Sequence, residues 1–243
     1  MKSLPRLGIL MLDTQFPRIP GDVGHPASFD FDVRYSIVEG ATPDAIVRSD
    51  SRPWIDSFAR AGQALVAEGC IGLATTCGFL TLAREDIARV CGVPVASSAL
   101  EQIPTLLTTL PNNRTVGILT ISAASLSRDH LEAAHVPPDV PVQGLDGSSF
   151  ARTILENQTE LDSAAAQAEM VEAARTLCLR HPKVAALVLE CTNMPPYAEA
   201  VAHATGRPVY SILNYLSWFH SGLVPRRKLP AGWDTFATLK GGI

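Results

Sequence analysis

The chain repeats one pattern twice, and this duplication limits the folds that it can adopt. In each copy an apolar run ends at a cysteine, a helical stretch follows, and a Gly-x-Pro-Val-x-Ser segment opens another apolar run. The cysteines are Cys77 and Cys191, and 15 residues separate them from Gly92 and Gly206, respectively. Buried parallel strands often resemble one another, so the apolar runs alone carry little weight. The recurring cysteine and Gly-x-Pro-Val-x-Ser segment instead predict a duplicated α/β unit with one thiol per copy.

Apolar runs alternate with stretches of helical periodicity along the whole chain, which is typical of parallel α/β sheets. We expect strands at residues 6–12, 33–38, 70–76, 93–97, 115–120, 141–145, 184–190 and 208–212. We expect helices at residues 54–66, 80–91, 99–110, 123–134, 161–179, 195–204 and 213–221. The Pro-Asn-Asn stretch at 111–113 divides the chain, so we predict one half at 1–113, joined by a returning segment 214–243, and a second half at 114–213.

Composition narrows the function classes. Apolar residues make up 47% of the chain and charged residues 18%, which is enough for a substantial core. The net charge of −4 comes without a long block of one sign, so we expect no nucleic-acid partner. We find no secretory pattern and no run of about 18 apolar residues, and we therefore expect a cytoplasmic protein without membrane contact. The sequence has no nucleotide-binding glycine motif and no paired metal-ligand spacing, so we expect neither cofactor nor metal.

Two of the five cysteines are candidates for chemistry. Cys77 and Cys191 follow predicted strands, and ligands of parallel sheets bind beyond the carboxyl ends of strands. A thiol there needs only a modest pKa shift to exchange its proton near neutrality, and the N–H groups of a following helix would favour its thiolate. The alternative is that cysteine packs as a small hydrophobic residue, which we expect for Cys70, Cys91 and Cys178.

The stretch Leu-Glu-Cys-Thr-Asn-Met-Pro at 189–195 resembles the second Cys-Thr motif of the aspartate/glutamate racemase superfamily. This superfamily is cofactor-independent and includes hydantoin racemases, arylmalonate decarboxylases and maleate isomerases. The resemblance covers nearly the whole chain. It implies an α/β fold of two pseudo-symmetric flavodoxin-like parallel-sheet halves, with the active site in the cleft between them.

The first cysteine motif departs from the superfamily. Its amino-acid racemases carry Cys-Asn-Thr, whereas this chain has Cys77-Gly78-Phe79, so backbone N–H groups would have to hold a substrate acid. Phe79 and Leu80 favour a substrate with an apolar or cyclic substituent over glutamate or aspartate. Alternatively, these two side chains begin a helix and point into the core. We expect the opposite wall of the pocket to be formed by Met194, Pro195, Pro196 and Tyr197.

The resemblance implies further site residues. Asp13 and Thr14 would assist deprotonation of the first thiol, although Asp13 could instead cap a loop. Thr120 and Ser122 would bind carboxylate oxygens, although either could be a helix N-cap. Arg18 could pair with a substrate carboxylate, but its place in a long loop favours a solvated surface position. Enolate charge would be stabilised by Thr76, Thr192 and Asn193.

These residues predict a racemase or epimerase, an isomerase in which the two cysteines exchange protons on opposite faces of a carbon next to a carboxylate or carbonyl. The substrate would be an amino acid, a hydantoin or a related small acid. Two alternatives stay open: a decarboxylase or cis-trans isomerase of a small diacid, and a non-catalytic protein that binds a small acid or senses redox state. We expect a small-molecule carboxylate as the partner and leave assembly into a homo-oligomer open.

Overall fold

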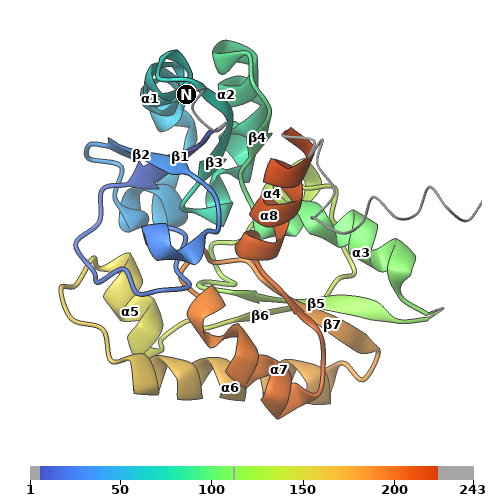
Figure 1. Ribbon diagram of the computed structural model, residues 1–243. Coiled ribbons are helices and arrows are strands. Elements are labelled where there is room, and N and C mark those ends of the chain that lie inside the picture. Colours follow the sequence, from blue (N-terminus) through green and yellow to red (C-terminus); the bar gives the residue numbers. More distant parts are fainter. Residues whose placement is uncertain (1–5, 112, 224–243) are drawn as a thin grey trace, which may run out of the picture.

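The computed structural model describes residues 6–111 and 113–223, which form two lobes around two four-stranded parallel sheets (Figure 1). The strands of the first sheet are β1 (Arg6–Leu12), β2 (Val33–Val38), β3 (Cys70–Thr75) and β4 (Val95–Ala96). Those of the second sheet are β5 (Thr115–Thr120), β6 (Val142–Gly144), β7 (Val184–Leu189) and β8 (Val209–Tyr210). The predicted α/β fold with two parallel-sheet halves is confirmed.

The two sheets repeat each other in detail. Their strand orders, β2-β1-β3-β4 and β6-β5-β7-β8, are equivalent, and the pairing of β1 with β3 and of β5 with β7 shifts register at the same point. Gly92 and Gly206 end equivalent helices in the left-handed conformation, with φ of 69° and 63°. Glycine adopts this conformation without strain, so the repeated glycine marks a helix end in both lobes.

The helices surround both sheets. They are α1 (Ile55–Ala67), α2 (Arg84–Cys91), α3 (Ile103–Thr109), α4 (Arg128–Ala133), α5 (Ser149–Leu155), α6 (Ser163–Arg180), α7 (Ala198–Thr205) and α8 (Ile212–Leu223). Short 3₁₀ helices lie at Pro26–Ser28, Arg52–Trp54, Gly78–Ala83, Ala99–Gln102 and Pro195–Tyr197, and one π-helical turn lies at Ala45–Ser49. Within the two described ranges, no helix has both the length and the hydropathy that a membrane span requires.

Several helices differ from their predicted ranges. The helix predicted at 80–91 starts as a 3₁₀ helix, and the one predicted at 123–134 begins only at Arg128. The reason is that the Asp146 carboxylate accepts the N–H of Ala123 at 2.8 Å and holds the preceding turn. Helix α5 was not predicted; Glu169, on α6, accepts its first N–H groups, so its start depends on a tertiary contact.

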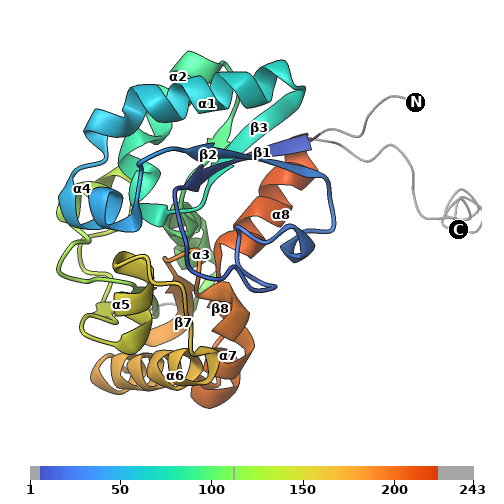
Figure 2. The same ribbon diagram turned by 90° about the vertical axis from the view of Figure 1, so that its left-hand side faces the viewer.

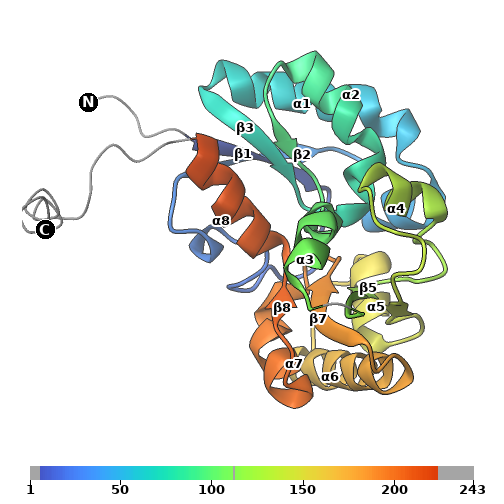
Figure 3. The same ribbon diagram turned by 90° about the vertical axis from the view of Figure 1, so that its right-hand side faces the viewer.

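Helices α4 and α8 follow strands of the second sheet in the chain but pack against the first lobe. Helix α4 packs against the 3₁₀ helix Gly78–Ala83 of the first lobe, where His130 meets Phe79 edge to face. Helix α8 packs against β3 and β4 (Figure 3), and Gly72 leaves the space that Phe219 and Leu223 of α8 fill. The predicted domain limits stay a prediction, and residues 224–243 of the returning segment lie outside the described residues.

The long loop at residues 13–30 runs from the first lobe to the second (Figure 2). The N–H of Gln15 donates to Oδ1 of Asn157 at 2.6 Å, and the N–H of Val23 donates to the carbonyl of Thr192 at 3.4 Å. Because both acceptors belong to the second lobe, the loop bridges the gap in front of the strand ends.

Candidate active site

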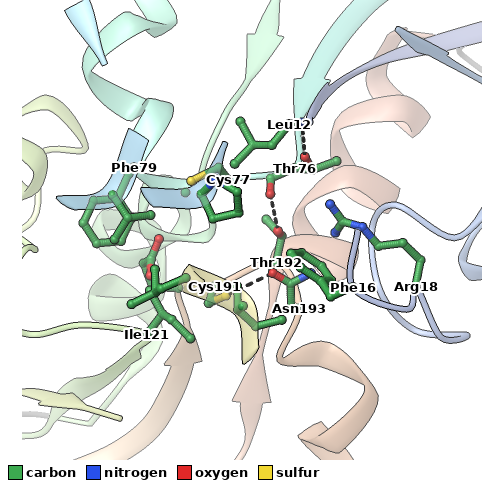
Figure 4. A pocket seen from close by; sticks show the side chains of 16 residues that line it. Leu12, Phe16, Arg18, Thr76, Cys77, Phe79, Ile121, Cys191, Thr192 and Asn193 are labelled. Atoms are coloured by element: carbon green, nitrogen blue, oxygen red, sulfur yellow. Dashed lines mark hydrogen bonds between the residues drawn. The ribbon is translucent and has the colours of Figure 1, made fainter. Parts of the chain in front are cut away.

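The two sheets bring the repeated cysteines into one cavity between the lobes. Cys77 lies just beyond β3 and Cys191 just beyond β7, and both side chains line the cavity (Figure 4). The Thr192 hydroxyl donates to the carbonyl of Thr76 at 2.6 Å, so the two cysteine motifs are hydrogen-bonded directly to each other. Equivalent strand ends thus present one thiol from each lobe to the same space.

The cavity is small and mostly apolar, with one basic and one acidic side chain in its wall. Its lining consists of Leu12, Phe16, Arg18, Pro43, Val47, Thr76, Cys77, Gly78, Phe79, Ile121, Ile154, Leu155, Glu190, Cys191, Thr192 and Asn193. The free volume of about 20 Å³ is enough for roughly one water molecule. A substrate of several heavy atoms therefore needs the cavity to widen. Phe16 and Arg18 belong to the loop 13–30, which makes that loop the natural part to move.

Both thiols are held in their neutral form. Burial, followed by the charge of Glu190, raises the pKa of Cys77 to about 12, although N–H groups of Phe79 and Leu80 act in the opposite direction. Burial and Glu190 also raise the pKa of Cys191 well above its usual value. The expectation of a modest shift towards thiolate is therefore wrong for this arrangement, because burial outweighs the N–H groups. The charge of Arg18 also favours the Cys77 thiolate but does not outweigh burial, so a further positive charge in the cavity would favour thiolate formation.

Glu190 is a functional candidate that the sequence did not single out. Its side chain is buried, with the residue 1% exposed, and its Oε2 accepts a hydrogen bond from the Thr120 hydroxyl at 2.8 Å. Burial raises its pKa to about 7, while the hydrogen bonds from Thr120 and from the N–H of Ile121 act against the rise. The available signal was an acidic residue within an otherwise apolar strand end, directly before Cys191.

The Arg18 side chain is largely buried, contrary to the solvated position that the sequence favoured. Its side chain is 12% exposed, and its guanidinium donates to Oδ1 of Asp22 at 2.9 Å and to Oγ1 of Thr14 at 3.0 Å. The guanidinium also lies 4.5 Å from the ring centroid of Phe16, a cation–π contact. Its Nε is buried without a hydrogen-bond partner, beside Gly24 of the same loop.

A chain of hydrogen bonds connects the loop to the second thiol. The Asn193 amide donates to Oδ2 of Asp22 at 2.5 Å, and the Cys191 thiol lies 3.5 Å from Oδ1 of Asn193, which accepts from it. Because Asp22 also accepts from Arg18, movement of the loop would alter the surroundings of Cys191.

The structure brings most of the predicted site residues to the cavity. The seven that line it are Thr76, Cys77, Gly78, Phe79, Cys191, Thr192 and Asn193. Some of their polar groups already form hydrogen bonds within the protein, since the Thr192 hydroxyl donates to the Thr76 carbonyl and the Asn193 amide donates to Asp22. In this closed arrangement, enolate stabilisation by these two donors would require them to exchange partners.

Four predicted site residues lie outside the lining. Asp13 accepts the N–H of Gly40 at 3.0 Å, and Thr14 accepts from Arg18. Thr120 donates to Glu190, and Ser122 donates to Oδ1 of Asp146 at 2.7 Å. Thr14 and Thr120 thus hold the charged residues of the wall rather than facing the cavity themselves.

The predicted apolar wall is also corrected. Met194, Pro195, Pro196 and Tyr197 do not border the cavity, because the chain turns into the core after Asn193 and leaves Met194 fully buried. Phe79 does line the cavity, while Leu80 packs in the core. The remaining apolar wall comes from Leu12 of β1, Phe16 of the loop 13–30, Ile154 and Leu155 of α5, and also from Pro43, Val47 and Ile121.

Comparison with known proteins gives relatives and a shared fold. No family model matches the chain. The chain is 29% identical over 233 residues to dimethylsulfoniopropionate lyase 5 of Emiliania huxleyi (strain CCMP1516), covering 90% of this chain and 46% of that protein. It is 28% identical over 225 residues to the dimethylsulfoniopropionate lyase of Durusdinium sp. clade D, covering 90% and 75%. The chain thus spans about half the length of the Emiliania protein.

Solved structures with the same fold belong to the superfamily that the sequence resembles. Unliganded arylmalonate decarboxylase superimposes with a TM-score of 0.61 at 14% identity, covering 95% of this chain and 97% of that one. Glutamate racemase from Francisella tularensis subsp. tularensis SCHU S4, in complex with D-glutamate, gives a TM-score of 0.54 at 16% identity, covering 93% and 85%. The resemblance to the aspartate/glutamate racemase superfamily is therefore confirmed at the level of the fold.

Proposed function

We propose that the chain is a lyase that eliminates dimethyl sulfide from a small sulfonium-substituted carboxylic acid such as dimethylsulfoniopropionate. The curated relatives, which match about nine-tenths of the chain, carry that activity in their names. The observation that carries the proposal is that one cavity holds both thiols together with Arg18. Such a cavity can bind a carboxylate and take up a proton beside it.

The proposed reaction breaks two bonds on neighbouring carbons. A cysteine thiolate removes a proton from the carbon next to the carboxylate, and the electron pair of that C–H bond forms a C=C bond. The C–S bond breaks with its electron pair staying on sulfur, which leaves as neutral dimethyl sulfide. The products are dimethyl sulfide, acrylate and a proton, which the thiol returns to water.

The substrate cation itself would help the base to form. Both thiols are neutral, because burial and the charge of Glu190 disfavour a second negative charge in the cavity. A sulfonium group brings a positive charge into the same space and so lowers the energy of the thiolate. An acid without such a cation lacks this assistance.

Racemisation of a small acid is the second candidate, and the arrangement of the thiols favours it. Cys77 and Cys191 come from equivalent strand ends of opposite lobes, as a two-base exchange on opposite faces of a carbon requires. The first step, removal of a proton beside a carboxylate, is the same in both proposals.

Two assays on the purified chain test these candidates. Incubation with dimethylsulfoniopropionate, followed by gas chromatography for dimethyl sulfide and NMR for acrylate, tests the lyase. Incubation of L-aspartate, L-glutamate, a 5-substituted hydantoin and an aryl-substituted acid in deuterated water, followed by NMR and chiral chromatography, tests the racemase. Stoichiometric sulfide and acrylate support elimination. Deuterium exchange with loss of chirality, and no release of dimethyl sulfide, would refute elimination and support racemisation.

A further inference from the structure

Glu190 occupies a position in the cavity wall that has no role in the proposed proton transfer. It lies at the end of β7, directly before Cys191, with the residue 1% exposed. Its Oε2 is bonded to the Thr120 hydroxyl, and the N–H of Ile121 also donates to the carboxyl group. A buried carboxyl group is costly unless something compensates its charge, so its presence in a ligand cavity requires an explanation.

The first cysteine motif, Cys77-Gly78-Phe79, leaves room for this carboxyl group at Gly78. A Cβ atom on Gly78 would overlap Oε1 of Glu190, and it would lie 2.8 Å from the Glu190 carbonyl oxygen. The Asn side chain that amino-acid racemases carry at this position therefore does not fit beside Glu190.

The two charged side chains of the cavity lie towards opposite ends. Figure 4 shows Arg18 on one side of the two cysteines and Ile121, whose N–H donates to Glu190, on the other. Aromatic rings accompany both ends, with Phe16 beside Arg18 and Phe79 on the side of Ile121. The cavity therefore presents a cation at one end, a carboxyl group at the other and the thiols between them.

We infer that Glu190 recognises the cationic substituent of the substrate, so that the cavity selects a zwitterion with a carboxylate at Arg18 and an onium group at Glu190. The inference rests on the proposed function and names the substrate group that the same site selects. An onium group with methyl substituents cannot donate strong hydrogen bonds, so charge and aromatic surface are the contacts that suit it. Glu190 and Phe79 supply these two contacts.

A pair of ligands with the same shape and different charge tests this inference. The probes are 3-(trimethylammonio)propanoate and 4,4-dimethylpentanoate, which carry a quaternary nitrogen and a quaternary carbon at the same position. Titration calorimetry measures their dissociation constants without requiring turnover. We expect the wild-type chain to bind the cationic probe at least about tenfold more tightly. We expect Glu190→Gln to bring the two constants together, and Glu190→Asp, which keeps the charge, to retain most of the preference.

Glu101→Gln is the matched control, because Glu101 is also a largely buried carboxyl group, hydrogen-bonded by Ser97 and ion-paired with Arg84, but outside the cavity lining. It should leave the preference unchanged. Equal binding of both probes by the wild-type chain, or an undiminished preference in Glu190→Gln, would overturn the inference. The wild-type measurement alone can do so if Glu190→Gln does not fold.

Two measurements separate this inference from the proposed function: the ratio of the dissociation constants of the two probes, and the release of dimethyl sulfide. A preference that depends on Glu190 without sulfide release refutes the lyase and keeps the cation site. Sulfide release with a preference independent of Glu190 keeps the lyase and refutes the cation site.

Discussion

Gly78 and Glu190 meet across the boundary between the lobes so closely that a Cβ atom on Gly78 would overlap the Glu190 carboxyl group. This Cβ atom would also lie 3.0 Å from the Ser98 hydroxyl oxygen, so a side chain at position 78 could not shift easily to relieve the overlap with Glu190. The position needs glycine for space and not for its backbone conformation, because its φ is not positive. The first cysteine motif is thus shaped by the residue before the second cysteine.

The first prediction is that Gly78→Ala displaces Glu190 and disturbs both thiols. Overpacking of a filled core costs about 1–3 kcal/mol of unfolding free energy, and we expect a roughly hundredfold loss of turnover from the altered cavity. Gly222→Ala is the control, because a Cβ atom on Gly222 meets nothing within 4 Å. Thermal unfolding and steady-state kinetics measure both effects. Unchanged stability and turnover in Gly78→Ala would contradict the close contact.

The strands and the position of the thiols were predictable because both depend on local patterns. Apolar runs marked the strands, and residues just beyond parallel strands reach the ligand edge of the sheet. This placed Cys77 and Cys191 correctly without any knowledge of how the lobes pack. The recurring glycines were equally informative, since Gly92 and Gly206 end equivalent helices.

The charged residues of the cavity were not predictable in the same way. Arg18 looked like a solvated loop residue, and its side chain is largely buried because the loop folds back on the second lobe through Asp22 and Asn193. Glu190 stood out only as a member of the second cysteine motif. The orientation of its side chain depends on the space that Gly78 leaves, and Gly78 lies more than a hundred residues earlier in the chain. Both positions result from contacts between segments that no local periodicity records.

The second prediction concerns the pH dependence of stability. The pKa of Glu190 is raised from 4.5 to about 7, so the folded state binds the proton more tightly than the unfolded chain does. The resulting stabilisation is present below pH 4.5 and is lost as pH rises through about 7. Wild type should therefore lose roughly 2–3 kcal/mol between pH 5 and pH 8 relative to Glu190→Gln. Denaturant unfolding at the two pH values measures this difference, and parallel pH profiles would refute it.

The third prediction separates one-base elimination from two-base racemisation. Elimination requires only one thiol as base, so Cys77→Ala and Cys191→Ala should lose sulfide release unequally, one by about 100-fold to 10,000-fold and the other much less. Cys91→Ala is the control, because Cys91 is a buried thiol bonded to the Ala59 carbonyl outside the cavity. Initial rates of sulfide release measure all three variants. Equal, complete loss in both cavity variants would instead favour a two-base mechanism.

The last prediction concerns Arg18 as the carboxylate-binding residue. Arg18→Lys keeps the positive charge beside Asp22 but removes the planar fork and the buried Nε, which has no partner in the protein. We expect KM to rise roughly tenfold with a smaller change in kcat, because the variant loses a binding contact more than a proton-transfer group. Arg52→Lys is the control, since the Arg52 side chain is 75% exposed and pairs only with Asp50 among the ion pairs of the described residues. Steady-state kinetics on the sulfonium substrate separate KM from kcat. A fall in kcat at unchanged KM would instead place Arg18 in the chemical step, and an unaltered enzyme would leave the carboxylate to the backbone N–H groups beside Cys77.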